Sequence, residues 1–232
     1  MPGLDGAHAY LKQLRERLAL AFADRRQAFQ RIHDHNLWGT TESVSGPGSH
    51  LAATESIRRE LPALVRRLGI ATLLDAPCGD LNWMRHILPD MGIRYIGADL
   101  VPAVVERARA ATDWPEASFL VLDIVEDPLP EADLWLCRDC LFHLSNADVF
   151  AALANFLRSG IPLLLTTIHT GPEPKNRDIR SGAFRWFDLF QPPFNVPRAP
   201  VALFDDYQPG WPPRQMVCVT REQVADALAR RG

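Results

Sequence analysis

Four aspartates recur at the ends of short apolar runs, where their carboxylates could bind one polar ligand. Asp75, Asp99 and Asp123 each end such a run, and Asp139 lies just beyond the next one. Short, nearly all-apolar runs that alternate with helical segments are typical of parallel strands, whose carboxyl ends share one edge of the sheet. Four acids would therefore converge on one crevice and need hydroxyl, amine or cationic partners. The alternative is that each aspartate caps the helix that follows it.

The spacing of the first two acids indicates what the ligand contains. Asp99 follows Asp75 by 24 residues, about the distance at which a mononucleotide-binding unit places an acid on ribose hydroxyls. The G-x-G-x-x-G loop that admits a pyrophosphate is absent, since Gly79 is the one glycine between Asp75 and Leu81. We also find no Tyr-x-x-x-Lys pair for hydride chemistry. The pattern therefore favours an adenosine without phosphate over a nicotinamide dinucleotide.

Alternating strands and helices must position these acids. Asp80 is expected to open a helix directly after the first strand, so that its dipole faces the crevice. The residues Thr220 to Gln223 match a capping box, which predicts that a short terminal helix begins there. The expected strands are 71–76, 94–98, 118–122, 133–137 and 161–168, with an antiparallel edge pair at 200–204 and 214–219, and the expected helices between them are 81–89, 102–112 and 146–158. This order predicts an α/β fold whose sheet is covered on both faces.

The region before the first strand reads as two helices joined by a loop. Apolar residues at helical spacing over 5–35 predict a helix whose basic residues form its solvated face, and a second helix is expected over 51–68. The segment 36–50 is rich in glycine, serine and threonine. It contains Trp38, and its residues 46–49 could present backbone N–H groups and hydroxyls to a ligand. Alternatively, it is a surface linker with one anchored tryptophan.

Composition excludes several classes of protein. A net charge of −3 without a basic patch gives no general attraction to nucleic acid or anionic lipid. The four cysteines are too few and too irregular for a disulfide framework, and Cys137-x-x-Cys140 lacks the second pair that a zinc site needs. We predict no metal, and burial of these thiols rather than redox chemistry. The sequence shows no apolar signal-peptide region and no apolar run long enough to span a membrane, so we expect a cytoplasmic protein.

The motifs around these acids resemble those of class I methyltransferases that use S-adenosylmethionine (SAM). LLDAPCGD resembles their first motif, GADL the second, VLDI the third, and LCRDCLFHLS the segment after the fourth strand, although Pro77 and Leu81 replace expected glycines. WGTTESVSGPGS together with DAPCGDLNWM looks like a group of small bacterial methyltransferases. The resemblance covers about 61–220. It implies a Rossmann-like, seven-stranded, mostly parallel sheet with an antiparallel strand at the edge. One methyltransferase domain would span 1–232, with a helical cap and loop over 1–60 and the SAM-binding core over 61–232.

The resemblance also implies a cofactor site. Asp75 and the backbone of Pro77, Cys78 and Gly79 would hold the methionine end of SAM. Asp99 would bind the ribose hydroxyls, and Asp123 with the Ile124 N–H would bind the adenine edge. Trp83 is expected beside the methionine end or the acceptor. The remaining residues predicted to contact SAM, or its product S-adenosylhomocysteine (SAH), are Trp38, Ser49, Leu100 and Arg138.

Methyl transfer to a hydroxyl would benefit from a base, and three residues are candidates for it. The family's substrate face would place Asp139, His143 and His169 near the methyl group, although either histidine could be an ordinary polar residue at the end of its element. The segment 172–198 is predicted to be a substrate lid that uses Arg180, Arg185 and Trp186, or else its aromatic residues belong to the core.

The expected function is therefore methylation of a small polar metabolite, at oxygen rather than nitrogen. No nucleic-acid or membrane partner is expected, and the oligomeric state is not predicted. The alternative is a non-catalytic partner or regulatory module of the same fold that binds an adenosine ligand. A nucleotide-dependent oxidoreductase is disfavoured by the loop after Asp75.

Overall fold

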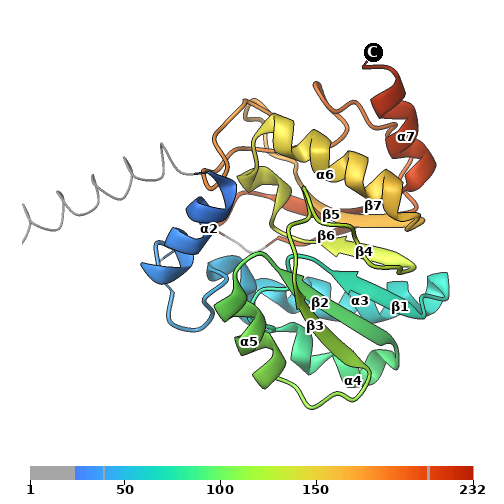
Figure 1. The fold of residues 1–232 in the computed structure, drawn as a ribbon. Coiled ribbons are helices and arrows are strands. Elements are labelled where there is room, and N and C mark those ends of the chain that lie inside the picture. The colour runs from blue at the N-terminus through green and yellow to red at the C-terminus, as the bar shows by residue number, and fades with distance from the viewer. Residues whose placement is uncertain (1–23, 39, 208–209, 232) are drawn as a thin grey trace, which may run out of the picture.

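One seven-stranded sheet organises the computed structural model, which describes residues 24–38, 40–207 and 210–231 (Figure 1). The strand order is β3-β2-β1-β4-β5-β7-β6. Strands β1 to β5 are parallel, whereas β7 runs antiparallel to both β5 and β6. The strands are β1 (Thr72–Asp75), β2 (Arg94–Asp99), β3 (Ala117–Val121), β4 (Leu134–Cys137), β5 (Leu163–His169), β6 (Ala202–Asp205) and β7 (Arg214–Thr220). The predicted fold class, including the antiparallel pair at the edge, is confirmed.

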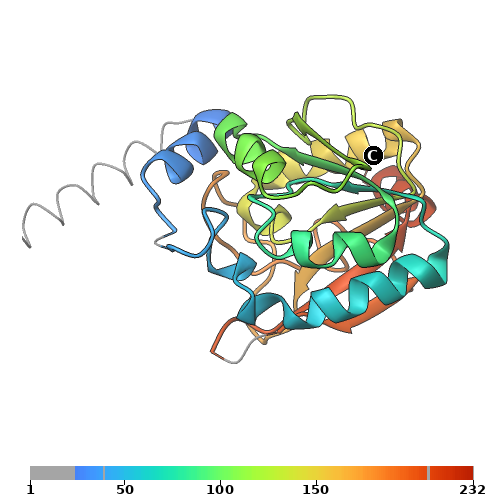
Figure 2. The same ribbon diagram turned by 90° about the horizontal axis from the view of Figure 1, so that it is seen from below.

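Helices cover both faces of this sheet (Figures 1 and 2). One hydrophobic core joins the sheet to α6 and α7, and a second joins the other face to α3 and α4. Successive strand residues serve the two cores in turn, so that Leu73 packs in the second core and Leu74 in the first. The helices are α2 (Arg25–Asp34), α3 (Glu55–Leu68), α4 (Leu88–Met91), α5 (Pro102–Ala110), α6 (Asn146–Ser159) and α7 (Arg221–Ala229). No helix in the described ranges is long and apolar enough to cross a membrane.

The helix predicted over 81–89 is wrong. After β1 the chain turns, forms a short 3-10 segment at Met84–His86 and reaches only the four-residue α4. Leu81 has a positive φ of 62°, which is incompatible with a right-handed helix. Asp80 does not cap a helix, because its carboxylate accepts hydrogen bonds from Ser43 Oγ and the Val44 N–H instead. No helix dipole therefore begins at Asp80.

The predicted N-terminal helix is confirmed where the structure describes it. Its part before residue 24 lies outside the described residues, and α2 accounts for the rest. Asp24 caps α2 with a reciprocal capping box to Gln27. The helix lies beside the carboxyl-terminal edge of the parallel strands (Figure 1).

Candidate functional site

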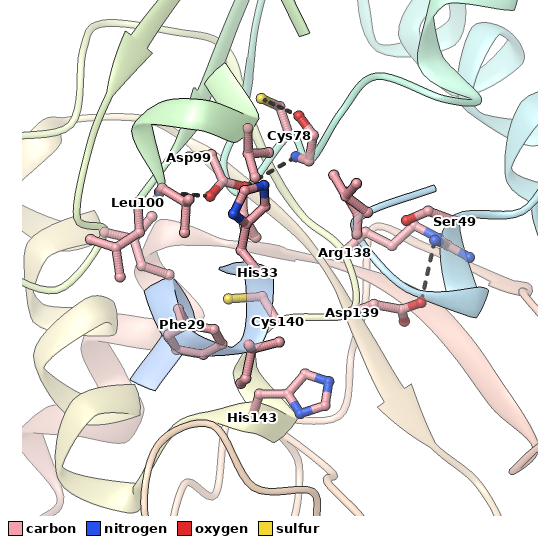
Figure 3. A pocket seen from close by; sticks show the side chains of 18 of the residues that line it. Phe29, His33, Ser49, Cys78, Asp99, Leu100, Arg138, Asp139, Cys140 and His143 are labelled. Atoms are coloured by element: carbon pink, nitrogen blue, oxygen red, sulfur yellow. Dashed lines mark hydrogen bonds and ion pairs between the residues drawn. The ribbon is translucent and has the colours of Figure 1, made fainter. Parts of the chain in front are cut away.

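A cavity opens where the strand order reverses between β1 and β4, at the carboxyl ends of the parallel strands. Its wall comes from three parts of the chain: the strand ends, the loop that contains Val44 and Ser49, and helix α2 (Figure 3). Every residue predicted to contact the cofactor lines this cavity: Trp38, Ser49, Asp75, Pro77, Cys78, Gly79, Trp83, Asp99, Leu100, Asp123, Ile124 and Arg138. Asp139 and His143 line it as well.

Asp99 presents a carboxylate with spare acceptor capacity. Its Oδ2 accepts the Gly79 N–H at 3.2 Å, and its Oδ1 accepts the Val101 N–H at 3.0 Å. A carboxylate has about four lone-pair positions, so each oxygen can accept a further hydrogen bond from the cavity. Burial raises the pKa of Asp99 to about 6, against the effect of the backbone donors. Two neighbouring hydroxyl groups would suit this acceptor.

Asp75 is a deeply buried acid of the cavity, with 2% of its surface exposed. Tyr95 donates its hydroxyl to Oδ2 of Asp75 at 2.6 Å. Burial raises the pKa of Asp75 to about 7, despite that hydrogen bond and the nearby Arg138. A cationic group in the cavity would therefore stabilise the ionised form of this carboxyl group.

The loop over 40–49 is a wall of the cavity, so the surface-linker interpretation is wrong. Ser45 holds it against the turn after β1, because the Asp80 N–H donates to Ser45 Oγ at 3.0 Å. Gly79 has a φ of +59°, and a Cβ there would lie 2.2 Å from Ser45 Oγ. Glycine is therefore required at this position for two reasons, its backbone conformation and the close approach of the loop.

Asp123 and α2 close one end of the cavity. Asp123 is 1% exposed, accepts the Val125 N–H at 3.0 Å through Oδ1 and pairs with Arg25 Nη2 at 2.7 Å through Oδ2. The prediction that the basic residues of this helix form only a solvated face is wrong for Arg25. The Ile124 N–H makes no hydrogen bond within the described chain, and it remains free to donate to a ligand.

Sequence reasoning missed the contribution of α2 to the cavity. Phe29, Ile32 and His33 line the cavity from this helix, beside Arg25. His33 interacts electrostatically with Asp99, and the two side chains lie in front of one another in Figure 3. The apolar spacing predicts a buried stripe, but it does not distinguish a core face from a cavity face. The pairing of Arg25 with an acid nearly a hundred residues away leaves no signal in the local sequence.

A buried cluster of two arginines and two aspartates lies on the opposite side of the cavity. Arg138 donates through Nε to Asp206 at 2.8 Å and through Nη1 to the Gly48 carbonyl at 2.9 Å. Its Nη2 is buried and has no hydrogen-bond partner among the described residues. The Trp83 ring, which also lines the cavity, lies 5.6 Å from this guanidinium. Arg138 therefore lines the cavity and also holds one buried donor that has no partner in the described chain.

Asp139 is held as a carboxylate by this cluster. Its Oδ2 lies 3.3 Å from both Arg138 Nη1 and Arg214 Nη1, and Thr167 Oγ1 donates to its Oδ1 at 3.1 Å. Burial opposes ionisation, but the two arginines outweigh it and lower the pKa of Asp139. A carboxylate with a lowered pKa accepts protons poorly, so this environment favours an orienting role for Asp139 over that of a base.

The two candidate histidines are held in opposite tautomers. His143 Nδ1 donates to the Ala183 carbonyl at 2.8 Å, which leaves Nε2 free to accept a proton. His169 Nδ1 instead accepts the Phe187 N–H at 3.2 Å, which places the proton of the neutral ring on Nε2. Burial lowers the pKa of His143, and it lowers the pKa of His169 to about 4. His143 is therefore suited to be a base, and His169 to be a hydrogen-bond donor.

A second cavity of about 330 Å³ adjoins the first. The two share Trp38, Ser45, Ser49, Asp139 and His143, so these residues lie at the junction. The second cavity is otherwise lined by residues of the glycine-rich loop and by aromatic and polar side chains: Gly46, Pro47, Gly48, Phe142, His169, Phe184, Trp211, Pro212 and Arg214. Two ligands could therefore meet at His143.

The residues predicted to bind the acceptor line neither cavity. Arg185 is 3% exposed, and its guanidinium lies 5.5 Å from the Phe187 ring and 5.7 Å from the Phe194 ring. Trp186 packs beside His169 at 5.3 Å, behind the cavity wall. Arg180 is likewise absent from both linings. The segment 172–198 thus divides: Phe187 and Phe194 are core, while Phe184 reaches the second cavity.

The cysteines make no site of their own. Cys137 and Cys140 are buried free thiols, and Cys140 lies at the wall of the first cavity. Within the described ranges, no group of three His, Cys, Asp or Glu side chains is placed to hold a metal ion.

The sheet order, with a cavity at its reversal, is that of the class I SAM-dependent methyltransferase fold. Residues 73–160 match the family model of the methyltransferase domain. A curated relative, the N-demethylindolmycin N-methyltransferase of Streptomyces griseus, is 25% identical over 152 residues. That match covers 60% of this chain and 64% of the relative, so the chain spans less than two thirds of the relative's length.

Solved structures share the fold at low sequence identity. A SAM-dependent methyltransferase of Leishmania major superposes with a TM-score of 0.62 at 14% identity, covering 86% of this chain and 87% of that one. The magnesium protoporphyrin IX methyltransferase of Synechocystis, with bound SAM, gives a TM-score of 0.58 at 11% identity over 87% of this chain and 99% of that one. Human N-acetylserotonin methyltransferase in complex with SAM gives a TM-score of 0.54 at 14% identity, covering 86% of this chain and 60% of that one.

Proposed function

We propose that this protein transfers the methyl group of SAM to a small-molecule acceptor. The observation that carries the proposal is the Asp99 carboxylate, which lines the cavity at the end of β2 and, among the described residues, accepts hydrogen bonds from backbone N–H groups alone. It suits the hydroxyl pair of a ribose. The loop after β1 brings one glycine, Gly79, rather than the three that a pyrophosphate requires.

The other polar groups of the cavity fit the remaining parts of SAM. The unused Ile124 N–H suits an acceptor nitrogen of adenine, and the second lone pair of Asp123 Oδ1 suits the adenine amine. Asp75 suits the amino group of the methionine end. The unpartnered Nη2 of Arg138 suits the carboxylate of that end. Bound SAM supplies an electrophilic methyl group.

We propose oxygen as the methylated atom. A hydroxyl becomes a good nucleophile when a base removes its proton, and His143 offers a free Nε2 at the junction of the cavities. Asp139 accepts a hydrogen bond from Thr167 and lies beside Arg138, so it can hold its surroundings in place next to the reacting atoms. The Streptomyces griseus relative is named an N-methyltransferase, which makes nitrogen the second candidate.

Titration calorimetry with SAM and SAH tests the cofactor assignment. We expect both ligands to bind with one site per chain and NADH not to bind. Transfer of a labelled methyl group to any acceptor then distinguishes an enzyme from a non-catalytic adenosine-binding module. Absence of SAM and SAH binding by the whole protein would contradict the proposal.

The base assignment predicts a specific pH profile. Turnover should fall on the acid side as His143 becomes protonated, with a midpoint below the ordinary imidazole value of 6.5, because burial lowers the pKa of His143. His143→Gln should reduce kcat about tenfold and flatten this acid limb, since correct positioning still supplies much of the rate. His169→Gln is the matched control and should keep the acid limb. An unchanged limb in His143→Gln would assign the histidine to structure.

A further inference from the structure

The second cavity is lined by a continuous cluster of aromatic rings. Phe142 lies at its centre, with ring-centroid distances of 4.4 Å to His143, 5.0 Å to His169 and 5.5 Å to Phe184. Trp38 extends the cluster from the opposite loop, 5.5 Å from His143. Phe142 meets His169 and Phe184 edge to face, whereas the Phe142–His143 and Trp38–His143 pairs are tilted. A further planar ring can pack against such a cluster, edge to face or offset.

Two of the aromatic side chains at this cavity are exposed, unlike most large apolar residues of the protein. Phe184 is 46% exposed and Trp211 is 43% exposed, whereas Phe187 and Phe194 of the same segment as Phe184 are almost fully buried. They reach the cavity from segments far apart in sequence, one after β5 and one before β7. Apolar rings that are exposed to water on the wall of an empty cavity are unfavourable in free energy. They provide contact area to an aromatic ligand.

The charges at this cavity are already neutralised. Asp139 and Arg214 line it and pair with each other at 3.3 Å, and Arg214 also contacts Asp206. Both histidines favour the neutral form because they are buried. Arg198 of the predicted lid segment 172–198 also has partners, because it pairs with Asp188 and lies over the Phe190 ring.

We propose that the acceptor is an uncharged, planar aromatic molecule that binds between these rings and presents its hydroxyl group to His143. This inference rests on the proposed function. It replaces the expectation of a polar metabolite, because the lining offers ring surfaces and no unpaired charge among the described residues. His169 Nε2–H provides a donor for a polar group of the acceptor.

Three molecules that share one fused two-ring framework test the proposal. We would titrate the SAH-saturated protein with 2-naphthol, its saturated analogue decahydro-2-naphthol, and the anionic 6-hydroxy-2-naphthoate. We expect 2-naphthol to bind at least about tenfold more tightly than either of the others, and to be methylated when SAM replaces SAH. Equal or tighter binding of the saturated or anionic molecule, or no binding of 2-naphthol, would overturn the proposal.

Variants then locate the binding site. Phe184→Leu and Trp211→Leu should each weaken 2-naphthol binding about fivefold and leave the affinity for SAH unchanged. Tyr207→Leu is the matched control, because Tyr207 is 48% exposed but lines neither cavity. Unchanged 2-naphthol binding in both variants would overturn the proposal while leaving the methyltransferase assignment intact. If the unaltered protein did not bind SAH, that result would instead contradict the methyltransferase assignment itself.

Discussion

Asp99→Ala should weaken the binding of SAM and SAH about 100-fold. The carboxylate faces the cavity and is the group best suited to accept both ribose hydroxyls. Hydrogen bonds to a charged acceptor contribute about 1.5–3 kcal/mol each, so the loss of two corresponds to roughly two or more orders of magnitude in the dissociation constant. Calorimetric titration of each ligand measures the change directly.

Two further variants separate recognition from folding. Asp99→Asn keeps the shape and can still accept hydrogen bonds, so it should lose less affinity than Asp99→Ala. Asp113→Ala, at an exposed position outside the cavity, should bind both ligands normally. Thermal melting of all three shows whether they are folded. A folded Asp99→Ala protein that binds SAM as tightly as the original would remove the central support of the proposed function.

The strands and their acids could be predicted from sequence because both are local features. Apolar runs such as the one that ends at Asp75 identify buried strands, and parallel strands that end on acids must bring those acids to one edge. The observed strands begin and end within two residues of the expected ranges. The acids of β1 and β2 line one cavity for this reason.

The predictions that are wrong concern segments and side chains whose positions are set by tertiary contacts. A helix after β1 was a reasonable expectation from composition, but the loop before α3 binds Asp80 and Leu81 adopts a left-handed conformation. Arg185 is one cation among several in its segment, and its type does not reveal that it packs against two phenylalanines. The sequence shows which chemistry a residue type can perform. Whether its side chain faces the ligand depends on tertiary packing, which the local sequence does not reveal.

Tautomers are also beyond sequence reasoning. His143 and His169 looked equivalent because both were expected near the methyl group. The backbone groups that contact them, the Ala183 carbonyl and the Phe187 N–H, assign them different capacities. Both partners come from the irregular segment after β5. This segment therefore affects the chemistry mainly through its backbone, and not through the basic side chains that were predicted to bind the acceptor.

Helix α2 connects the adenosine end of the site to the acceptor wall. Arg25 pairs with Asp148 at 2.6 Å, and Ser181 donates its hydroxyl to the other oxygen of Asp148. A Cβ on Gly182 would lie only 3.3 Å from the Ala28 side chain, so the helix also packs closely on the chain that leads to Phe184. Movement of α2 would therefore disturb both cavities.

Arg25→Met should lower the free energy of unfolding by about 3 kcal/mol and weaken SAH binding. The substitution keeps the aliphatic stem but leaves Asp123, which is 1% exposed, without its closest cationic partner. Removal of one partner of a buried ion pair costs about 3–5 kcal/mol, and the half-exposed Arg26, 3.4 Å from Asp123, compensates in part. Urea denaturation with and without SAH measures both effects. Arg31→Met, at an exposed position of the same helix, is the matched control and should change stability by less than about 0.5 kcal/mol. If Arg25→Met were as stable as Arg31→Met and bound SAH equally well, α2 would be a passive cover rather than a part of the cofactor site.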